Sequence, residues 1–271
     1  IIPFEENMVN KYLNKVVTSF DAPINDPNNI TLYALCDKIK KEFGYKVVLC
    51  GEGADELFAG YTRHFNSFNK INETNNINEL VLGNNYLTIE RLNLIDWNLD
   101  CEFEERSKIL ENLNSKKILN KILEYDQKTF LQSRLYCQDI IGMANSIEIR
   151  TPILDHKLAD FINSLPVKFK HNGLFSKYLF RLAAEKFLPK RVCWDKKKVA
   201  LNIPYSRQLK EGFLKKLFIE NINDKSIIRN FCNIEKLINL FNIHKPNHST
   251  QDHSNTLWRL LSLELWLKKI Q

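Results

Sequence analysis

The sequence contains no apolar run near the ~18 residues that a membrane-spanning helix requires. It also shows no repeat at a fixed period and no low-complexity tract apart from an enrichment in asparagine. Its 271 residues are 44% hydrophobic, 26% charged and 11% aromatic, close to the averages of soluble globular proteins. These features exclude membrane-spanning, disordered, collagen-like and mucin-like classes, and the length permits one large domain or two small ones.

No two of the six cysteines form a Cys-x-x-Cys pair, the spacing typical of metal and redox sites. Most lie in apolar or helical stretches, where free thiols behave as small hydrophobic groups, so we expect a reducing, cytoplasmic location. The first ten residues lack the basic region, apolar core and small-residue cleavage site of a signal peptide. Because the chain starts with Ile1 rather than Met, we expect it to begin inside a longer gene product.

The chain carries a net charge of +7. This balance suits a nucleic acid, an anionic membrane surface or a polyanionic small molecule such as ATP. The basic residues are dispersed, with one dense cluster at Lys196 to Lys198, and the sequence has no zinc-finger spacing or RNA-binding aromatic motif. We therefore expect neither nucleic acid nor a membrane as a partner.

The first part of the chain has the pattern of an α/β unit. From Ile30 to Glu42 apolar residues recur at helical spacing with lysines on the opposite face, which predicts an amphipathic helix that ends at Gly44. Lys46 to Cys50 is a short apolar run bounded by glycines, typical of a buried parallel strand. A helix, a strand, a glycine loop and a second helix in this order indicate an α/β fold.

After Leu87 nearly all of the chain is predicted to be helical. The preceding stretch, Phe65 to Asn85, is rich in asparagine and weakly patterned, which is typical of surface loops and marks the best candidate boundary. The sequence thus predicts an α/β unit at residues 1–65 followed by a mostly helical portion at residues 66–271. The expected helices, with apolar residues three and four apart, are Lys108–Leu123, Thr129–Ala144, His156–Ser164, Ser176–Phe187 and Asn255–Lys269.

The segment from Val48 to Tyr61 (VLCGEGADELFAGY) carries the densest set of chemically useful residues. Its first two glycines lie where a strand ends and a helix begins, so backbone N–H groups there can approach an anion such as phosphate. Three carboxylates, those of Glu52, Asp55 and Glu56, repel phosphate by themselves, and their presence makes sense if Mg²⁺ lies between them. The alternative is that the acids only favour the first turn of a helix and the glycines form a tight turn.

The same segment resembles the motif V-x-L-S-G-x-G-[AS]-D-E-[LV]-F-x-G-Y of the synthetase domain of glutamine-hydrolysing asparagine synthetases and their amidotransferase relatives. The resemblance continues downstream in the same order. Asp139 to His156 is similar to the family's D-x-x-[ST]-M-A-x-S-[VL]-E-x-R-x-P-[FL]-L-D-H segment, and Lys177 to Arg181 is similar to its K-x-x-L-R helix. Lys198 to Pro204 resembles its K-x-G-[FL]-x-x-P motif, and Leu257 to Leu267 resembles its final helix.

This resemblance implies a fold that binds an adenine nucleotide on a parallel sheet and activates a carboxylate with ATP and Mg²⁺. Ammonia from glutamine then attacks the acyl-adenylate, which gives asparagine, AMP and pyrophosphate when the acid is aspartate. The matched motifs imply that Glu52 is the base, that Lys198 is the catalytic cation and that Asp55 holds Mg²⁺. The nucleotide is expected to lie against Leu49, Cys50, Gly51 and Gly53.

The lysine run leaves its register open. Counting back from the downstream proline selects Lys198 as the family's lysine, whereas counting forward from the upstream proline selects Lys197. A solvated loop is the alternative for the whole run. Lys177 and Arg181 lie one helical turn apart, and they face either phosphate or solvent.

Glu148, Arg150 and Asp155 form a charged set within an otherwise apolar stretch, so we expect them to be buried and paired. We favour a structural ion-pair network for them over direct catalysis, and Arg150 near the substrate is the alternative. Glu56 is likewise a candidate for either substrate binding or a structural role.

The match begins after the S-G-G-x-D-S pyrophosphate loop of such enzymes, and their N-terminal glutaminase domain has no counterpart here. The isolated chain is therefore expected to be inactive, and a homodimer is one assembly to consider. Two other interpretations stay open: a relative that acts on a glycan, β-lactam or peptide carboxylate, and a non-catalytic homologue that serves as a binding module. The presence of Glu52, Asp55 and a candidate lysine argues against the last.

Overall fold

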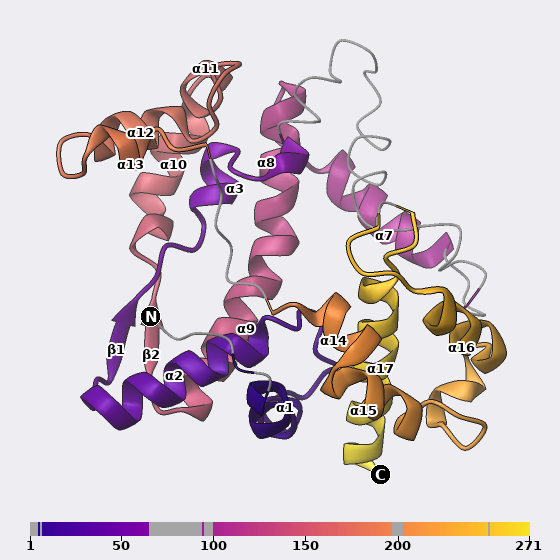
Figure 1. Ribbon diagram of the computed structural model, residues 1–271. Coiled ribbons are helices and arrows are strands. Elements are labelled where there is room, and N and C mark those ends of the chain that lie inside the picture. Colours follow the sequence, from indigo (N-terminus) through magenta and orange to yellow (C-terminus); the bar gives the residue numbers. More distant parts are fainter. Residues whose placement is uncertain (1–4, 6, 65–93, 95–99, 197–202, 249) are drawn as a thin grey trace.

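The computed structural model describes residue 5 and residues 7–64, 94, 100–196, 203–248 and 250–271. It has a mixed α/β fold in which a small parallel sheet lies at one side of a larger set of helices (Figure 1). The elements up to the second strand are α1 (Asn7–Ser19), α2 (Asn29–Phe43), β1 (Val47–Leu49), α3 (Ala54–Phe58), α7 (Asp100–Glu111), α8 (Ile118–Lys128), α9 (Phe130–Ala144) and β2 (Glu148–Arg150). After a 3₁₀ turn at Pro152–Leu154 come α10 (His156–Ser164), α11 (Val167–Lys170), α12 (Tyr178–Ala184), α13 (Lys190–Cys193), α14 (Tyr205–Glu211), α15 (Phe213–Asn221), a second 3₁₀ turn at Ile227–Asn230, α16 (Ile234–Ile243) and α17 (Ser254–Ile270).

The two strands lie parallel, with Val48 opposite Ile149, as the apolar run before the glycines predicted. The expectation that the first strand is buried is wrong, because Val47 is 42% and Leu49 is 71% exposed. Within the described residues the sheet has only these two strands. Val48 and Ile149 pack against the main core, whereas the face of Val47 and Leu49 is left open. Burial of a strand on both sides requires layers on both faces of its sheet, which a pattern within one strand does not reveal.

A tight corner joins α9 to β2 and fixes their relative position. The backbone N–H of Ile147 donates to the carbonyl oxygen of Gly142 at 2.8 Å, and a Cβ atom at position 142 would lie only 2.6 Å from the Ile147 carbonyl oxygen. The Asn145 side chain donates to the Ile141 carbonyl oxygen at 2.9 Å. This corner sets α9 beside the loop that follows β1.

The predicted helix at residues 30–42 is confirmed as α2, which ends where Gly44 adopts φ +66° and donates its N–H to the Lys40 carbonyl oxygen. The single helix expected at residues 108–123 is wrong, because two helices, α7 and α8, occupy this region. Between them the N–H groups of Asn114 and Ser115 donate to the Glu124 carboxylate at 3.1 and 3.0 Å, so side-chain acceptors replace the helical carbonyls.

The main hydrophobic core lies where α1, α2 and α9 meet the C-terminal helices α14 to α17 (Figure 1). Helices α9, α10 and α17 confirm the predicted helical segments, and α12 is shorter than the helix expected at residues 176–187. A smaller apolar cluster of Leu57, Phe58 and Ile162 joins α3 to α10. Among the described residues, no helix combines the length and apolar character needed to cross a membrane. The predicted boundary at residues 65 and 66 borders a stretch outside the described residues, and the division into two parts stays a prediction.

Candidate functional site

The glycine loop begins where β1 ends and continues into α3. The Cys50 N–H donates to the Arg150 carbonyl oxygen at 2.9 Å, so the pairing with β2 extends one residue into the loop. Gly53 has φ +91°, a conformation that favours glycine, and a Cβ atom there would also collide with the side chain of Leu154. At Gly51 no atom lies within 4 Å of an added Cβ, so the space beside this backbone is open.

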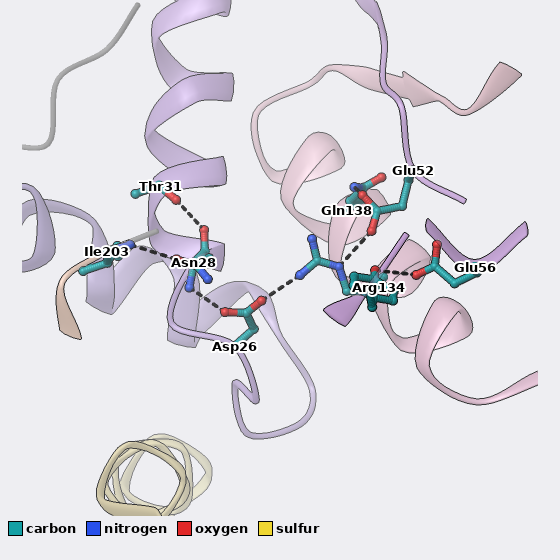
Figure 2. A network of polar contacts seen from close by, with 9 residues as sticks. Asp26, Asn28, Thr31, Glu52, Glu56, Arg134, Gln138 and Ile203 are labelled. Carbon is teal, nitrogen blue, oxygen red and sulfur yellow. Dashed lines mark hydrogen bonds and ion pairs between the residues drawn. The ribbon is translucent and has the colours of Figure 1, made fainter. Parts of the chain in front are cut away.

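The Glu52 carboxylate is held from one side of α9 (Figure 2). The Arg134 Nε atom donates to Glu52 Oε1 at 2.9 Å, and the Gln138 Nε2 atom donates to Glu52 Oε2 at 2.8 Å. Arg134 Nη1 also donates to Asp26 Oδ2 at 2.7 Å. Burial lowers the pKa of the Arg134 guanidinium, but the charges of Glu52 and Asp26 outweigh it and raise that pKa above its usual value. Arg134 thus bridges the carboxylates of Glu52 and Asp26, and the Glu52 side chain stays 16% exposed.

The residues expected to face the nucleotide line the start of this loop. Leu49 is largely exposed and offers an apolar side chain next to the glycines. The Cys50 thiol lies 3.4 Å from Gln138 Oε1 as a donor, and burial raises the pKa of this thiol. A protonated thiol is a small, weakly polar group, so it places no charge beside the loop backbone.

Asp55 lies one turn further along and is paired with Lys177, the residue just before α12. Lys177 Nζ lies 3.1 Å from Asp55 Oδ1, and the Lys177 N–H donates to the Phe58 carbonyl oxygen at 2.9 Å. Lys177 adopts φ +54°, an uncommon conformation for a lysine, which aims its backbone at α3. At Gly60 an added Cβ would collide with both Asp55 and Lys177. The absence of a side chain at this glycine therefore allows the ion pair to pack against the backbone.

A cavity of about 330 Å³ opens beside the pair, and its volume exceeds that of a few water molecules. Three of its wall residues, Lys177, Arg181 and Lys196, bring positive charge, and Asp55 and Asp195 supply the negative charge. Glu52 does not line this cavity. The lining residues are Asp55, Gly60, Tyr61, Thr62, His171, Leu174, Phe175, Ser176, Lys177, Arg181, Asp195 and Lys196.

Glu56 is the third carboxylate of the loop and points into the protein. It is 1% exposed, and Tyr61 donates its hydroxyl to Glu56 Oε1 at 2.6 Å. Burial raises the pKa of Glu56 above its usual value. Burial and the neighbouring Glu56 charge also raise the pKa of Tyr61. Of its two predicted roles, these contacts favour a structural one that ties the middle of α3 to the segment that follows it.

The expectation that Glu148, Arg150 and Asp155 are buried together is wrong. Glu148 and Arg150 pair with each other at 2.8 Å, but their side chains are 54% and 60% exposed on the open face of the sheet, opposite Val47 and Leu49. The Asp155 carboxylate accepts from the Lys157 and Leu158 N–H groups at 3.1 and 3.2 Å as the N-cap of α10. In a strand of three residues the charged side chains alternate outward around Ile149, which explains their exposure.

Lys177, the N-cap residue of α12, and Arg181 within this helix have different surroundings. Arg181 donates to the carbonyl oxygens of Ser176, Cys193 and Asp195, so its guanidinium holds the chain around the cavity. Lys177 is the one that reaches Asp55. The candidate catalytic residues Lys197 and Lys198 lie outside the described residues. Lys196 is described and lines the cavity, with Nζ 4.9 Å from the centre of the Phe175 ring.

The residues around Asp55 fit a magnesium ion that is shared with phosphate. Groups of three or more histidine, cysteine or acidic residues that could hold a metal are absent from the described part of the chain. Mg²⁺ does not need such a cage, because one or two carboxylates together with phosphate oxygens and water complete its octahedral shell. Asp55 lines a cavity whose other charged wall residues are mostly basic, and its Oδ1 atom lies 3.1 Å from Lys177 Nζ.

The sequence did not identify the residues that hold Glu52. Arg134 and Gln138 lie four residues apart on α9, so they share one face of this helix. An arginine and a glutamine at this spacing within an apolar helix is a weak signal for a polar site. Their partner Glu52 lies 82 and 86 positions away, and Asp26 lies 108 positions from Arg134.

Comparison with known proteins adds a family to this geometry. The family model described as asparagine synthase matches residues 2–268. Asparagine synthetase [glutamine-hydrolyzing] 1 of Bacillus subtilis (strain 168) is 25% identical over 295 residues, which cover 94% of this chain and 46% of that protein. Asparagine synthetase [glutamine-hydrolyzing] 3 of the same strain is 28% identical over 195 residues, which cover 69% of this chain and 31% of that protein. The chain therefore spans less than half the length of these curated relatives.

Proposed function

This chain belongs to the asparagine synthase family, and we propose that it is the synthetase portion of an ATP-dependent ligase that converts the side-chain carboxylate of aspartate to an amide. Ammonia from glutamine is the proposed nitrogen donor, and asparagine, AMP and pyrophosphate are the products. The proposal for the whole protein includes an upstream glutaminase domain and pyrophosphate loop.

One observation carries this proposal: a single glycine loop holds two carboxylates in two different settings. Glu52 is fixed by Arg134 and Gln138 and stays accessible to solvent, whereas Asp55 faces a cavity whose other charged side chains are mostly basic. A carboxylate that accepts one hydrogen bond on each oxygen keeps a lone pair on each for a proton. The loop therefore offers a base and a metal ligand three residues apart.

Different residues of the chain are proposed to bind the nucleotide, to accept the proton and to stabilise the developing charge. Asp55 would hold Mg²⁺, which when bound neutralises the charge of the phosphates, and the open backbone at Gly51 admits the nucleotide. Transfer of AMP gives the substrate carboxylate a good leaving group. Glu52 takes the proton that the attacking nitrogen loses as the amide bond forms. Lys198, or Lys197 in the other register, is proposed to balance the negative charge that develops on the substrate oxygen and phosphate.

Pyrophosphate release by the full-length protein tests the reaction. We expect release from ATP to depend on aspartate and magnesium and to match asparagine formation. Release that depends on another carboxylate instead would reassign the substrate within the family. If no carboxylate tested supports release, the catalytic proposal is wrong and the chain is a binding module.

Substitution of Glu52 by glutamine tests the base. Because glutamine cannot take up the proton, we expect amide formation to fall by about 10²- to 10⁴-fold, while pyrophosphate release in the first turnover is retained. Glu42→Gln is the matched control, since Glu42 is half exposed and pairs only with Lys38 among the described residues. Loss of pyrophosphate release together with intact amide transfer from added adenylate would contradict the assignment.

A further inference from the structure

The contacts around Glu52 point to a residue on α9 that the proposed reaction also requires. We propose that Arg134 is a positioning residue that holds the Glu52 carboxylate in the direction needed to accept a proton. This inference rests on the proposed function of Glu52 as the base. Figure 2 shows the arrangement, in which Arg134 lies between Glu52 and Asp26 and reaches both carboxylates.

Glu52 needs such a support because its own loop gives little. It stands between Gly51 and Gly53, the two residues with the widest backbone freedom, and its side chain has three rotatable bonds. Arg134 fixes Oε1 and Gln138 fixes Oε2, so two donors from one helix determine both the position and the tilt of the carboxylate. An orientation set this way is what proton transfer within hydrogen-bond reach requires.

Arg134 is itself held from its far side. Its Nη1 atom donates to Asp26 Oδ2 at 2.7 Å, and Asp26 Oδ1 accepts the Asn28 N–H at 2.9 Å. The Asn28 side-chain oxygen accepts the Ile203 N–H at 2.9 Å, and its carbonyl oxygen accepts the Thr31 hydroxyl at 2.7 Å. The guanidinium therefore rests on a network anchored in the backbone of the α2 start (Figure 2).

The network around Glu52 has an excess of negative charge and is partly exposed to water. One guanidinium is shared between two carboxylates, so the set of Asp26, Glu52 and Arg134 carries a net charge of −1 when all three are ionised. Arg134 is 34% exposed and Asp26 29% exposed, so water also screens the pairs.

The test uses Arg134→Gln in the full-length protein, with Gln132→Ala on the exposed side of the same helix as the matched control. If Arg134 positions the base, amide formation falls about 30- to 100-fold, below the loss for Glu52→Gln, while first-turnover pyrophosphate release changes less than about 3-fold. The KM for ATP is expected to stay unchanged. Arg134→Lys is expected to recover part of the loss, because one ammonium can replace one of the two contacts.

A double variant separates positioning from general support. In the Glu52→Gln background, Arg134→Gln is expected to cause no further loss of amide formation, since the group that it positions is already gone. A further independent loss, or an equal loss of pyrophosphate release and amide formation in the single variant, would show that Arg134 only braces the fold.

A crystal structure of Arg134→Gln gives a measurement that does not depend on activity. The expected result is an unchanged fold in which the Glu52 carboxylate has left Gln138 Nε2. A carboxylate that stays within hydrogen-bond distance of Gln138 would overturn the inference. If instead the wild-type protein releases no pyrophosphate with any carboxylate, the proposed function fails, while this structure still shows whether Arg134 sets the position of Glu52.

Discussion

Two clusters of charged side chains in the described part of the chain invite comparison. The loop cluster is Glu52, Arg134 and Asp26, with side chains 16%, 34% and 29% exposed. The core cluster is Asp126 on α8 with Arg63 and His64, which are 7%, 21% and 0% exposed. Both contain an arginine that makes two hydrogen bonds to carboxylate oxygens. They differ in which acceptor oxygens these hydrogen bonds reach and in how exposed the side chains are to water.

In the core cluster all the donors converge on one oxygen atom. Arg63 Nε and Nη2 lie 3.2 and 2.8 Å from Asp126 Oδ2, and His64 Nε2 lies 2.5 Å from the same atom. Burial raises the pKa of Asp126, but the hydrogen bond from His64 and the charge of Arg63 outweigh it, so this pKa is lowered. Burial lowers the pKa of His64.

The difference separates a structural cluster from one that is free to react. An acceptor oxygen that already has three donors and lies out of water has no place for a ligand or a further proton. In the loop cluster each Glu52 oxygen accepts from one donor among the described residues, and solvent reaches the carboxylate. Paired charges thus serve stability in one place and are proposed to serve chemistry in the other.

The largest expected effect on stability comes from Asp126→Asn. The change removes the carboxylate that compensates Arg63 and orients His64, so we expect the free energy of unfolding to fall by about 3 kcal/mol. Chemical denaturation of the full-length protein, followed by tryptophan fluorescence, measures this loss. The folded variant is expected to keep the activity of the wild type.

The control for Asp126→Asn is Glu105→Gln, which removes one partner of an exposed pair with Lys108. We expect an unchanged denaturation midpoint, because exposed pairs contribute little. Equal stability of wild type and Asp126→Asn, or a loss of activity per folded molecule, would break the division between the two clusters.

How far the sequence predicted these regions depends on the range of each contact. Local periodicity and the glycines predicted α2, α9, α10, α17 and the parallel strand β1, because these features are determined within a few residues. The sequence did not predict the exposure of Leu49 or the hydrogen-bond partners of Glu52. Exposure of a strand depends on its neighbouring layers, and the contact of Glu52 with Arg134 depends on how α9 packs against the loop.

Lys170 extends the comparison of the two charged clusters to a single buried charge, because it has no ion-pair partner in the described part of the chain. It is 1% exposed, and its Nζ atom donates to Asn120 Oδ1 at 3.1 Å. Burial lowers the pKa of Lys170 to about 8. Because the pKa of an unfolded lysine is about 10.4, the folded state disfavours the charge by about 3 kcal/mol at neutral pH. Lys170→Met is therefore expected to stabilise the protein at pH 7, by about 1 to 2 kcal/mol after the lost hydrogen bond is counted.

The pH dependence of this gain has a definite sign. Between pH 8 and the unfolded pKa the unfolded state binds more protons than the folded state, so wild-type stability rises with pH in that window. The advantage of Lys170→Met should shrink accordingly between pH 7 and about pH 10. Denaturation midpoints of both proteins across this range measure it. An advantage that stays constant, or a destabilised variant at pH 7, would mean that the Asn120 contact compensates the buried charge.

The smallest effect is expected at Glu148 and Arg150, the pair that the sequence placed in a buried network. Both side chains are exposed. Mainly through their shared hydrogen bond, Arg150 lowers the pKa of Glu148 and Glu148 raises the pKa of Arg150. Water and salt screen such a pair, so Arg150→Ala should leave the denaturation midpoint of the full-length protein unchanged within error. Proposed catalysis should also be unaffected, because Arg150 contacts Glu148 rather than the glycine loop through its side chain. A loss of amide formation with unchanged stability would instead place Arg150 near the substrate, and it would extend the reactive region from the loop cluster to the edge of β2.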